Sequence, residues 1–575
     1  MSTFPWLTVA GAIPLAGAIA VGLMPGQSAP GGEADRRARA RLIKQTTLVF
    51  TLATLVVTII MALRFKTGAG APTFQFAQTY QWIPQFGVHY AVGVDGIALV
   101  LILMTTVLMP VVVLASWNDV EGESNPAGEP PAKRSVKTYF MLMLVLETMM
   151  IGVFAATDVF LFYVFFEAML IPMYFMIGSY GVGQRQYAAV KFLLYSLLGG
   201  LLMLVAVIAL YVYSIHAGHP GTFLFSQLVH VSLSPTTQKW LFLGFFVAFA
   251  IKAPLWPFHT WLPDAAAAAQ PGAAVLLVGV LDKVGTFGLI RYCLELFPAG
   301  AHYFTPLVLV LAVIGVLYAA IVAIGQRDLK RLIAYTSVSH MGLITLGIFA
   351  MTSEGQAGGV LYMVNHGFAT GALFLIAGFM IARRRSQLIA DYGGVQKVAP
   401  VLAGLFLIAG LAGLALPGLS TFVSEFLVLI GTFTRYEVAA ILATVGIILA
   451  AIYILWMYQR TMTGPVREEV ATMPDLKPRE LWAVGPLIAL VVVLGVYPKP
   501  LLDLINPAVH QTLVQVHSPD PVPSHPGTQS TTTQAAVHAR AARTPSHLAL
   551  SLCLPRGGDP PRPPRNCVLD QRSSP

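Results

Sequence analysis

Long apolar runs bounded by short polar stretches recur along most of the chain. A helix needs about 20 predominantly apolar residues to cross a bilayer, and on that length the pattern predicts about 14 crossings. This spacing is typical of an all-α, polytopic membrane protein. The predicted spans cover residues 5–24, 45–64, 92–116, 137–156, 158–178, 188–213, 237–262, 273–296, 304–325, 329–351, 358–382, 400–433, 437–459 and 481–498.

Two of these spans are interrupted by helix-breaking residues. The seventh contains FAIKAPLWPFHTWLPDA (Phe249–Ala265), where Lys252 precedes Pro254, and the twelfth breaks at Pro417–Gly418, just before Glu425. Irregular backbone at membrane depth is tolerated only where it lines a cavity or packs against protein. Paired broken spans also point to the inverted repeats of transporters. We therefore expect two inverted five-helix repeats, in spans four to eight and nine to thirteen.

This pattern predicts three N-terminal spans in residues 1–136, a first repeat in 137–296, a second in 304–459 and a last membrane helix in 481–500. The composition then changes to Pro, Ser, Thr, His and Arg, as in HSPDPVPSHPGTQSTTTQ. Such a sequence cannot bury a hydrophobic core, so residues 517–575 are predicted to form a disordered tail.

Basic residues between the spans favour one side of the membrane. They follow spans one, three, nine, eleven and thirteen, which the predicted count places on the same side. Loops rich in lysine and arginine face the cytoplasm. We therefore expect a multi-pass protein of a bacterial plasma membrane with both termini on the outer side. The residues are Arg36, Arg37, Arg39, Arg41, Lys44, Lys133, Arg134, Arg327, Lys330, Arg331, Arg383, Arg384, Arg385, Arg467, Lys477 and Arg479.

Composition excludes several other classes of protein. Charged residues make up 11% of the chain, against about 25% in soluble domains. The net charge of +9 comes from short loops and does not indicate nucleic-acid binding. The three cysteines, Cys293, Cys553 and Cys567, have no metal-ligand spacing, and no glycine-rich strand-to-helix turn indicates a dinucleotide site. The sequence therefore predicts no metal and no cofactor in this chain.

Eight ionisable residues within the predicted spans stand out, because they lie in otherwise apolar stretches. A charge at the bilayer centre costs about 2.5–3.5 kcal/mol on insertion scales, and such residues usually mark ion or proton pathways. Each alone also has a structural explanation, as an ion pair or a hydrogen-bonded core residue, but together they favour a pathway. They are Glu147, Glu167, Lys252, Asp282, Lys283, His340, His366 and Glu425.

These residue types suit proton transfer. Burial disfavours the charged forms of lysine and carboxylate, and a nearby opposite charge restores them. A Glu–Lys pair that forms and breaks can therefore load and release a proton, and histidine can pass protons between such groups. Asp282 is adjacent to Lys283, so on a helix it points about 100° away and is not its natural partner.

Four stretches resemble the antiporter-like membrane subunits of proton-pumping NADH:quinone oxidoreductase (respiratory complex I), and within them the M-type branch. The resemblance covers about residues 4–505. The stretches are FYVFFEAMLIPMYF, FAIKAPLWPFHTWLPDA, DLKRLIAYTSVSHMG and LPGLSTFVSEF.

The resemblance implies a role for six of the ionisable residues. Glu167 and Lys252 match the family's coupled pair in the first half-channel, and Lys283 matches the lysine that passes protons toward the centre. His340 and His366 match the histidines of the central axis. Glu425 matches the acid near the exit, where the sister chains L and N usually carry lysine.

The resemblance also implies a non-redox, proton-translocating subunit. NADH, FMN, iron–sulfur clusters and quinone would then be held by partner subunits, the membrane-arm partners being of the L and N type within the lipid bilayer. Two positions depart from the family pattern. Ala266 stands where a histidine is common, and Asp282 stands where an apolar residue is usual before the lysine of span eight.

Two other hypotheses remain open at this point. A subunit of a multi-subunit cation/proton antiporter would share the fold and the lysines, although Glu425 in place of lysine argues against it. A membrane anchor that only scaffolds a complex would explain the spans but not the line of charges.

Overall fold

A computed structural model of the chain describes residues 4–26, 32–68, 70–121, 125–127, 135–216 and 221–521. The chain divides into two compact units, Met1–Pro521 and Val522–Pro575, and the description concerns the first. The predicted tail lies outside the described residues from position 522 onward, and so do the loop residues Lys133 and Arg134.

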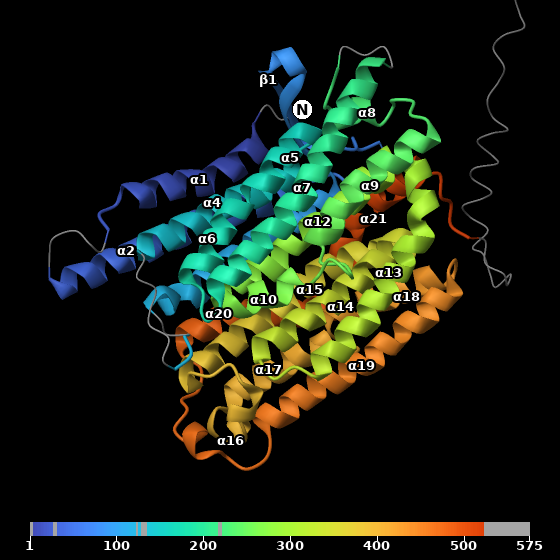
Figure 1. Cartoon of the computed structure of the whole chain (residues 1–575). Helices are drawn as coiled ribbons and strands as arrows, with labels where there is room; N and C mark the ends of the chain where they lie inside the picture. Colours follow the sequence, from blue (N-terminus) through green and yellow to red (C-terminus); the bar gives the residue numbers. More distant parts are fainter. Residues whose placement is uncertain are drawn as a thin grey trace, which may run out of the picture. The chain divides into compact units, whose positions relative to one another are not determined.

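Helices dominate the first unit (Figure 1). Their bounds are α1 Trp6–Leu23, α2 Glu33–Arg64, α3 Gly96–Ala115, α4 Val136–Ala155, α5 Val159–Ala168, α6 Leu170–Tyr180, α7 Arg185–His216, α8 Phe225–Leu228, α9 Pro235–Lys252, α10 Trp261–Ala268, α11 Pro271–Leu276, α12 Asp282–Gly288, α13 Pro298–Ile324, α14 Leu329–Ala350, α15 Ser353–Arg384, α16 Val395–Val398, α17 Pro400–Gly413, α18 Ser420–Phe433, α19 Glu437–Met462, α20 Pro478–Val496 and α21 Lys499–Gln515.

Twelve helical runs in the described residues are long and apolar enough to cross a membrane. This confirms the predicted all-α membrane fold, while the count of fourteen crossings and the inverted repeats stay predictions. Asp158 separates α4 from α5, because its side chain caps α5 by accepting from the backbone N–H groups of Phe160 and Leu161. The run from α5 to α6 crosses as one unit, Val159–Tyr180.

Both predicted breaks are present in the backbone. Helix α9 ends at Lys252 and α10 begins at Trp261, so eight residues, including Pro254 and Pro257, are non-helical between them. In the other break, α17 ends at Gly413 and α18 begins at Ser420. Gly418 has a φ of +92° there, a conformation that glycine adopts without steric cost.

A two-stranded antiparallel sheet precedes α3 and was not predicted. Strands β1 (Gln75–Ile83) and β2 (Val88–Val94) form a hairpin that turns at Gly87, whose φ is +64°. Its alternating polar and apolar residues do not form the continuous apolar run of a span. The third span was predicted to begin at residue 92, but α3 begins at Gly96, where Asp95 accepts a capping hydrogen bond from Ala98 N at 2.8 Å.

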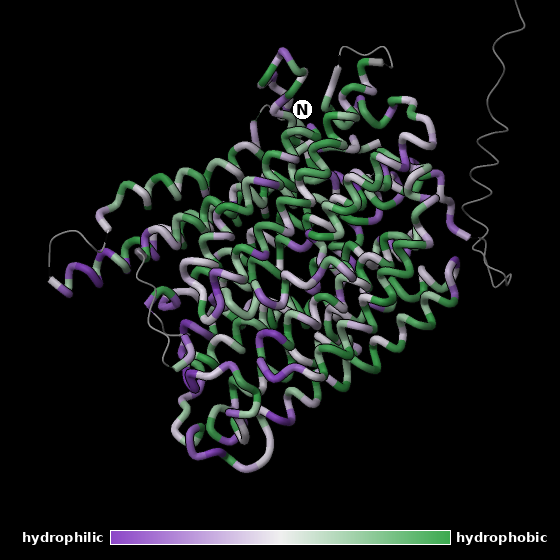
Figure 2. The backbone as a smooth tube through the Cα atoms, in the orientation of Figure 1, coloured by the Kyte–Doolittle hydropathy of each residue, from purple (hydrophilic) through white to green (hydrophobic). Residues whose placement is uncertain are grey.

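The helices form a buried centre and a lipid-facing rim. Helices α14 and α15, and the run from α11 through α12, are buried almost throughout, whereas α1, α2 and α19 expose many apolar side chains. Figure 1 places α1 and α2 at one edge and α19 at another. Figure 2 shows hydrophobic residues along the helices, with the hydrophilic ones gathered mainly in the loops at their ends. Polar residues inside the centre are therefore shielded from lipid.

A buried ion pair fastens the end of α15 to the start of α20. Arg383 donates from both terminal nitrogens to Glu480, at 3.2 and 2.6 Å, and its side chain is 5% exposed against 1% for Glu480. Breaking such a pair from one side leaves an uncompensated buried charge, which costs more than the pair itself contributes.

We expect Glu480→Ala to destabilise the protein by about 3–5 kcal/mol, because Arg383 loses its carboxylate. The double variant Arg383→Met/Glu480→Met should retain most of the stability, since no buried charge is left alone. The measurement is the fraction of tagged protein that stays soluble when detergent-extracted membranes are heated. Equal losses in the single and double variants would contradict this account.

Candidate functional site

Glycine makes room for the carboxylate of Glu167 near the end of α5. A Cβ added to Gly200, on the neighbouring helix α7, would lie 1.7 Å from Glu167 Oε1. That oxygen is buried and has no hydrogen-bond partner in the part of the chain that the structure describes. Helix α7 therefore admits this carboxylate only because position 200 has no side chain.

Lys252 lies at the last turn of α9, where the helix breaks. Its side chain is buried, and Nζ has no hydrogen-bond partner among the described residues. The ammonium lies 5.1 Å from the ring centre of Phe166 and 5.7 Å from that of Phe192, which gives partial cation–π stabilisation. It interacts electrostatically with Glu167 and Asp282. The structure thus brings Glu167 and Lys252 into one site, without a direct hydrogen bond.

The eighth span has an irregular backbone around its charged residues. Helix α12, which carries Asp282 and Lys283, lies between two π-helical stretches, Leu277–Leu281 and Leu289–Leu294. Such stretches are rare and often occur at functional sites. Both carboxylate oxygens of Asp282 are buried without a hydrogen-bond partner in the described residues. Its electrostatic partners are Lys283 and Lys252, so Asp282 bridges the seventh and eighth spans.

Lys283 connects the eighth span to two histidines. Its Nζ hydrogen-bonds the carbonyl of Val278 and lies 2.6 Å from Nδ1 of His366, on α15. The rings of His366 and His340 are 5.2 Å apart and nearly perpendicular. Since α14 carries His340, three neighbouring spans contribute to this central group.

Two tyrosines extend the line from the histidines to Glu425. Nε2 of His340 lies 3.3 Å from the hydroxyl of Tyr453, on α19, and the ring of His340 lies 5.7 Å from that of Tyr362. Tyr362 donates a hydrogen bond to Oε1 of Glu425, which is buried on α18. Neither tyrosine was predicted to belong to the site, because aromatic residues are ordinary in membrane helices.

Glu147 stands apart from this line. It is fully buried on α4, and neither carboxylate oxygen has a hydrogen-bond partner within the described ranges. No charged side chain among the described residues acts on this carboxylate electrostatically. The structure therefore brings together Glu167, Lys252, Asp282, Lys283, His340, His366 and Glu425, but not Glu147.

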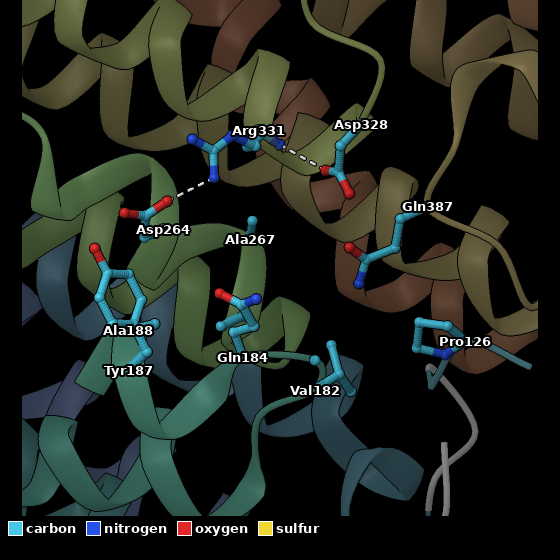
Figure 3. Close-up of a pocket in the computed structure, with 12 residues that line it drawn as sticks. Pro126, Val182, Gln184, Tyr187, Ala188, Asp264, Ala267, Asp328, Arg331 and Gln387 are labelled. Atoms are coloured by element: carbon cyan, nitrogen blue, oxygen red, sulfur yellow. Dashed lines mark hydrogen bonds and ion pairs between the residues drawn. The ribbon is translucent and has the colours of Figure 1, made fainter. Parts of the chain in front are cut away.

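A cavity of 260 Å³ lies between α7, α10 and the start of α14. Asp264 is held on one side of it by two cations, accepting from Lys191 at 2.7 Å and from Arg331 at 2.5 Å. Figure 3 shows the Asp264–Arg331 contact on one side and Gln387 and Pro126 on the other. Burial raises the pKa of Asp328, while the backbone N–H of Arg331 stabilises its charged form. Asp264, between its two cations, thus lines this cavity.

In the described residues, no group of three or more His, Cys, Asp or Glu side chains could hold a metal ion. The side chains that lead from Lys283 to Glu425 are instead acids, bases and hydroxyls. Several of them lie within hydrogen-bond distance of the next one. Such an arrangement is suited to passing protons rather than to binding an organic cofactor.

The chain is similar in sequence to membrane subunits of NADH:quinone oxidoreductase. The family described as "NADH:quinone oxidoreductase/Mrp antiporter, TM" matches residues 156–451. NADH-quinone oxidoreductase subunit M of Mycobacterium tuberculosis strain H37Rv is 53% identical over 552 residues, covering 92% of this chain and 97% of the relative. NADH-ubiquinone oxidoreductase chain 4 of Arabidopsis thaliana is 36% identical, covering 83% of this chain and 92% of the relative.

Solved structures agree with these sequence relatives. A chain of respiratory complex I from Thermus thermophilus with bound NADH superposes with a TM-score of 0.77 at 31% identity, covering 89% of this chain and 99% of that one. A chain of the Mrp complex from Dietzia sp. DQ12-45-1b has a TM-score of 0.74 at 20% identity, covering 90% of this chain and all of that one. The second likeness concerns the fold alone.

We expect Gly200→Ala to destabilise the protein by about 1–3 kcal/mol, because the new methyl group overpacks against the Glu167 carboxylate. Gly404→Ala is the matched control, since a Cβ at that position in α17 meets no atom within 4 Å. The heating assay described for Glu480 measures both. If the two variants lose solubility at the same temperature, position 200 is not packed against Glu167.

Proposed function

The chain belongs to the transmembrane family of NADH:quinone oxidoreductase and Mrp antiporter subunits, and from this membership we propose that it is an M-type, proton-translocating subunit of the membrane arm of NADH:quinone oxidoreductase. The relative at 53% identity bears that subunit's name and is matched over nearly its whole length. The hypothesis of a stand-alone antiporter has weaker support. The similarity to the Mrp chain, at 20% sequence identity, concerns the fold alone.

One observation carries the proposal. Buried groups that can accept and donate protons form a line from Lys283 through His366 and His340 to Tyr362 and Glu425. Isolated ionisable groups in a membrane protein are expensive and need local compensation. A line of them, contributed by four different spans, has no equivalent structural explanation, and it supports a path for protons through the membrane.

In this mechanism the Glu167–Lys252 site loads the proton. When the two side chains separate, the lysine gives up its proton more readily, because the carboxylate no longer stabilises its charge. Asp282 lies within electrostatic reach of Lys252 and is adjacent to Lys283, so it attracts the proton toward the eighth span. His366 and His340 then pass it on, and Tyr362 delivers it to Glu425.

Quinone reduction elsewhere in the complex supplies the driving force. A charge that moves in a neighbouring subunit would open or close the Glu167–Lys252 pair, and no electron would pass through this chain. An iron–sulfur cluster needs several cysteine thiolates, and the single cysteine of the described residues, Cys293, is buried and alone. NADH, FMN, the iron–sulfur clusters and quinone are assigned to partner subunits.

The proposed setting is a bacterial plasma membrane, with chains of the L and N type as neighbours in the membrane arm. Arg327, Arg331 and Arg383–Arg385 lie at the ends of helices on one face, which the distribution of basic residues makes the cytoplasmic one. Both termini would then lie on the outer side.

We expect Lys252→Ala and Glu167→Gln to lower NADH-driven proton translocation in membrane vesicles by about a hundredfold or more, the typical loss when a positioned proton-transfer group is removed. Quinone reductase activity should fall with it, because the two processes are coupled. The matched controls are Lys397→Ala and Glu468→Gln, which remove the same charges from exposed positions in the short helix α16 and in the segment after α19. A native gel stained for NADH dehydrogenase activity shows whether each variant chain has assembled.

The proposal would be contradicted if the Lys252→Ala and Glu167→Gln variants both assembled and both pumped protons at the wild-type rate. They would favour the hypothesis of a scaffold, in which the charges are structural. Migration of the wild-type chain in a small, inactive assembly would instead favour the antiporter.

A further inference from the structure

Helices α15 and α18 pack against each other along a seam lined by glycines. A Cβ added to Gly358 of α15 would lie 2.7 Å from both Cβ of Leu427 and N of Val428. One added to Gly431 of α18 would overlap the backbone of Gly355. Because these positions have no room for a methyl group, the two helices touch at their backbones. The paired residues run in opposite directions along the two helices, so the packing is antiparallel and has one register.

Polar contacts fix this seam at both ends. At one end Thr352, the residue before α15, donates to the carbonyl of Gly431 at 3.0 Å. At the other end the Nδ2 group of Asn365 donates to the carbonyl of Ser420 at 2.6 Å and to Oγ of Ser424 at 3.3 Å. The second of these ends lies at the start of α18, directly after the break in the twelfth span.

The start of α18 depends on neighbouring elements for support. Helices often begin at a residue whose side chain bonds the first turn, but Leu419 at the N-cap of α18 makes no such bond. Thr421 instead reaches back across the break and donates to the carbonyl of Ala412, near the end of α17. The first turn of α18 is therefore held from α17 by Thr421 and from α15 by Asn365.

Asn365 and Tyr362 contact the same stretch of α18. They are three residues apart on α15, so their side chains lie on one face of that helix. Asn365 bonds the first turn of α18, and Tyr362 donates to Glu425, which directly follows Ser424. A rotation or slip of the start of α18 would therefore move Glu425 away from the hydroxyl of Tyr362.

The amide of Asn365 is an expensive group to bury. The residue is fully buried, and its Oδ1 has no hydrogen-bond partner in the part of the chain that the structure describes. A buried acceptor without a partner costs free energy, which a leucine of similar size would avoid. The presence of an amide at this position is therefore explained by the two bonds that its Nδ2 group donates to α18.

We propose that Asn365 is a positioning residue, which holds the broken start of α18 in the register in which Glu425 meets Tyr362. The inference rests on the proposed function and adds the contact that keeps the last group of the line in place. The amide carries no proton in this role and acts only through Glu425. Without it, the first turn of α18 can turn about the break at Gly418, whose φ is +92°.

The test compares Asn365→Leu with Gln356→Leu in assembled complexes. Gln356 is the matched control, because it is a buried amide of the same helix that donates to the carbonyl of Ile348, on α14, at 3.2 Å. We expect Asn365→Leu to slow NADH-driven proton transport about fivefold, the factor that one net hydrogen bond is worth. Gln356→Leu should leave the rate for each assembled complex unchanged.

A chemical readout distinguishes positioning from a general loss of stability. Dicyclohexylcarbodiimide is an apolar reagent that modifies carboxyl groups inside membranes, and mass spectrometry quantifies the labelled peptides. A carboxyl oxygen held by the hydroxyl of Tyr362 is less accessible to the reagent than a detached one. We expect Asn365→Leu to raise labelling at Glu425 about fivefold, by the same factor. Labelling at Glu147 should not change, since that residue lies on α4, away from the seam.

Two results in Asn365→Leu would overturn the proposal: proton transport at the wild-type rate, or labelling of Glu425 at the wild-type rate. Equal losses of transport in Asn365→Leu and Gln356→Leu would also overturn it, because they would reflect only the removal of a buried amide. Glu425→Gln, run in parallel, separates this failure from failure of the proposed function, because it should slow transport however α18 is held.

A second variant covers the case in which Asn365→Leu does not assemble. Ser424→Ala removes the longer of the two contacts and leaves the bond to Ser420 in place. We expect it to raise labelling of Glu425 about twofold, as for a weak hydrogen bond. Its control is Thr432→Val, which removes a buried hydroxyl whose bond stays within α18 and should leave labelling unchanged. Wild-type labelling in Ser424→Ala would overturn the proposal.

Discussion

The cost of a polar group that lacks a partner inside the membrane determines how this structure is built. Lys283 meets that cost with a backbone carbonyl and His366, and Glu425 meets it with the hydroxyl of Tyr362. Glu167 and Lys252 have no such protein partners in the described residues. The departures from regular helix, namely the break after Lys252 and the π-helical stretches around Lys283, lie at these groups. There they supply the free carbonyls and the space for water that a regular helix does not offer.

The two breaks serve the site in different ways. The first separates α9 from α10 and places Lys252 at one end of the break, with Thr260 and Asp264, which contact Tyr195 and Lys191 of α7, at the other. The second places Glu425 two turns into α18, where Tyr362 of α15 reaches it. In the proposed mechanism, loading and release occur at opposite ends of a line whose middle, Lys283 and the two histidines, lies on buried helices. Their close packing keeps the relay groups within reach of one another, and the breaks provide the freedom that a moving proton requires.

Much of this could be predicted from the sequence. Continuous apolar runs identify the spans, and prolines beside Lys252 and Glu425 mark the breaks, because both signals are local. The hairpin before α3 was missed, since its alternating residues carry no membrane signal. Gly200, Tyr362 and Tyr453 were missed because their roles depend on contacts between distant helices. Asp282 was not expected to face Lys283, and no hydrogen bond joins its carboxylate to any described residue. Lys283 is nevertheless its first electrostatic partner, and the second, Lys252, could be found only from the packing of two spans.

The most direct test of the account is the rate of NADH-driven proton transport when the middle of the line is removed. Lys283→Met keeps the size of the side chain and removes its charge, and an assembled complex carrying it can be reconstituted in liposomes. With proton transport and NADH oxidation recorded together, the account predicts that both rates fall in parallel, because the two processes are coupled. Wild-type rates of both would contradict it, because protons would then cross the membrane without passing through Lys283.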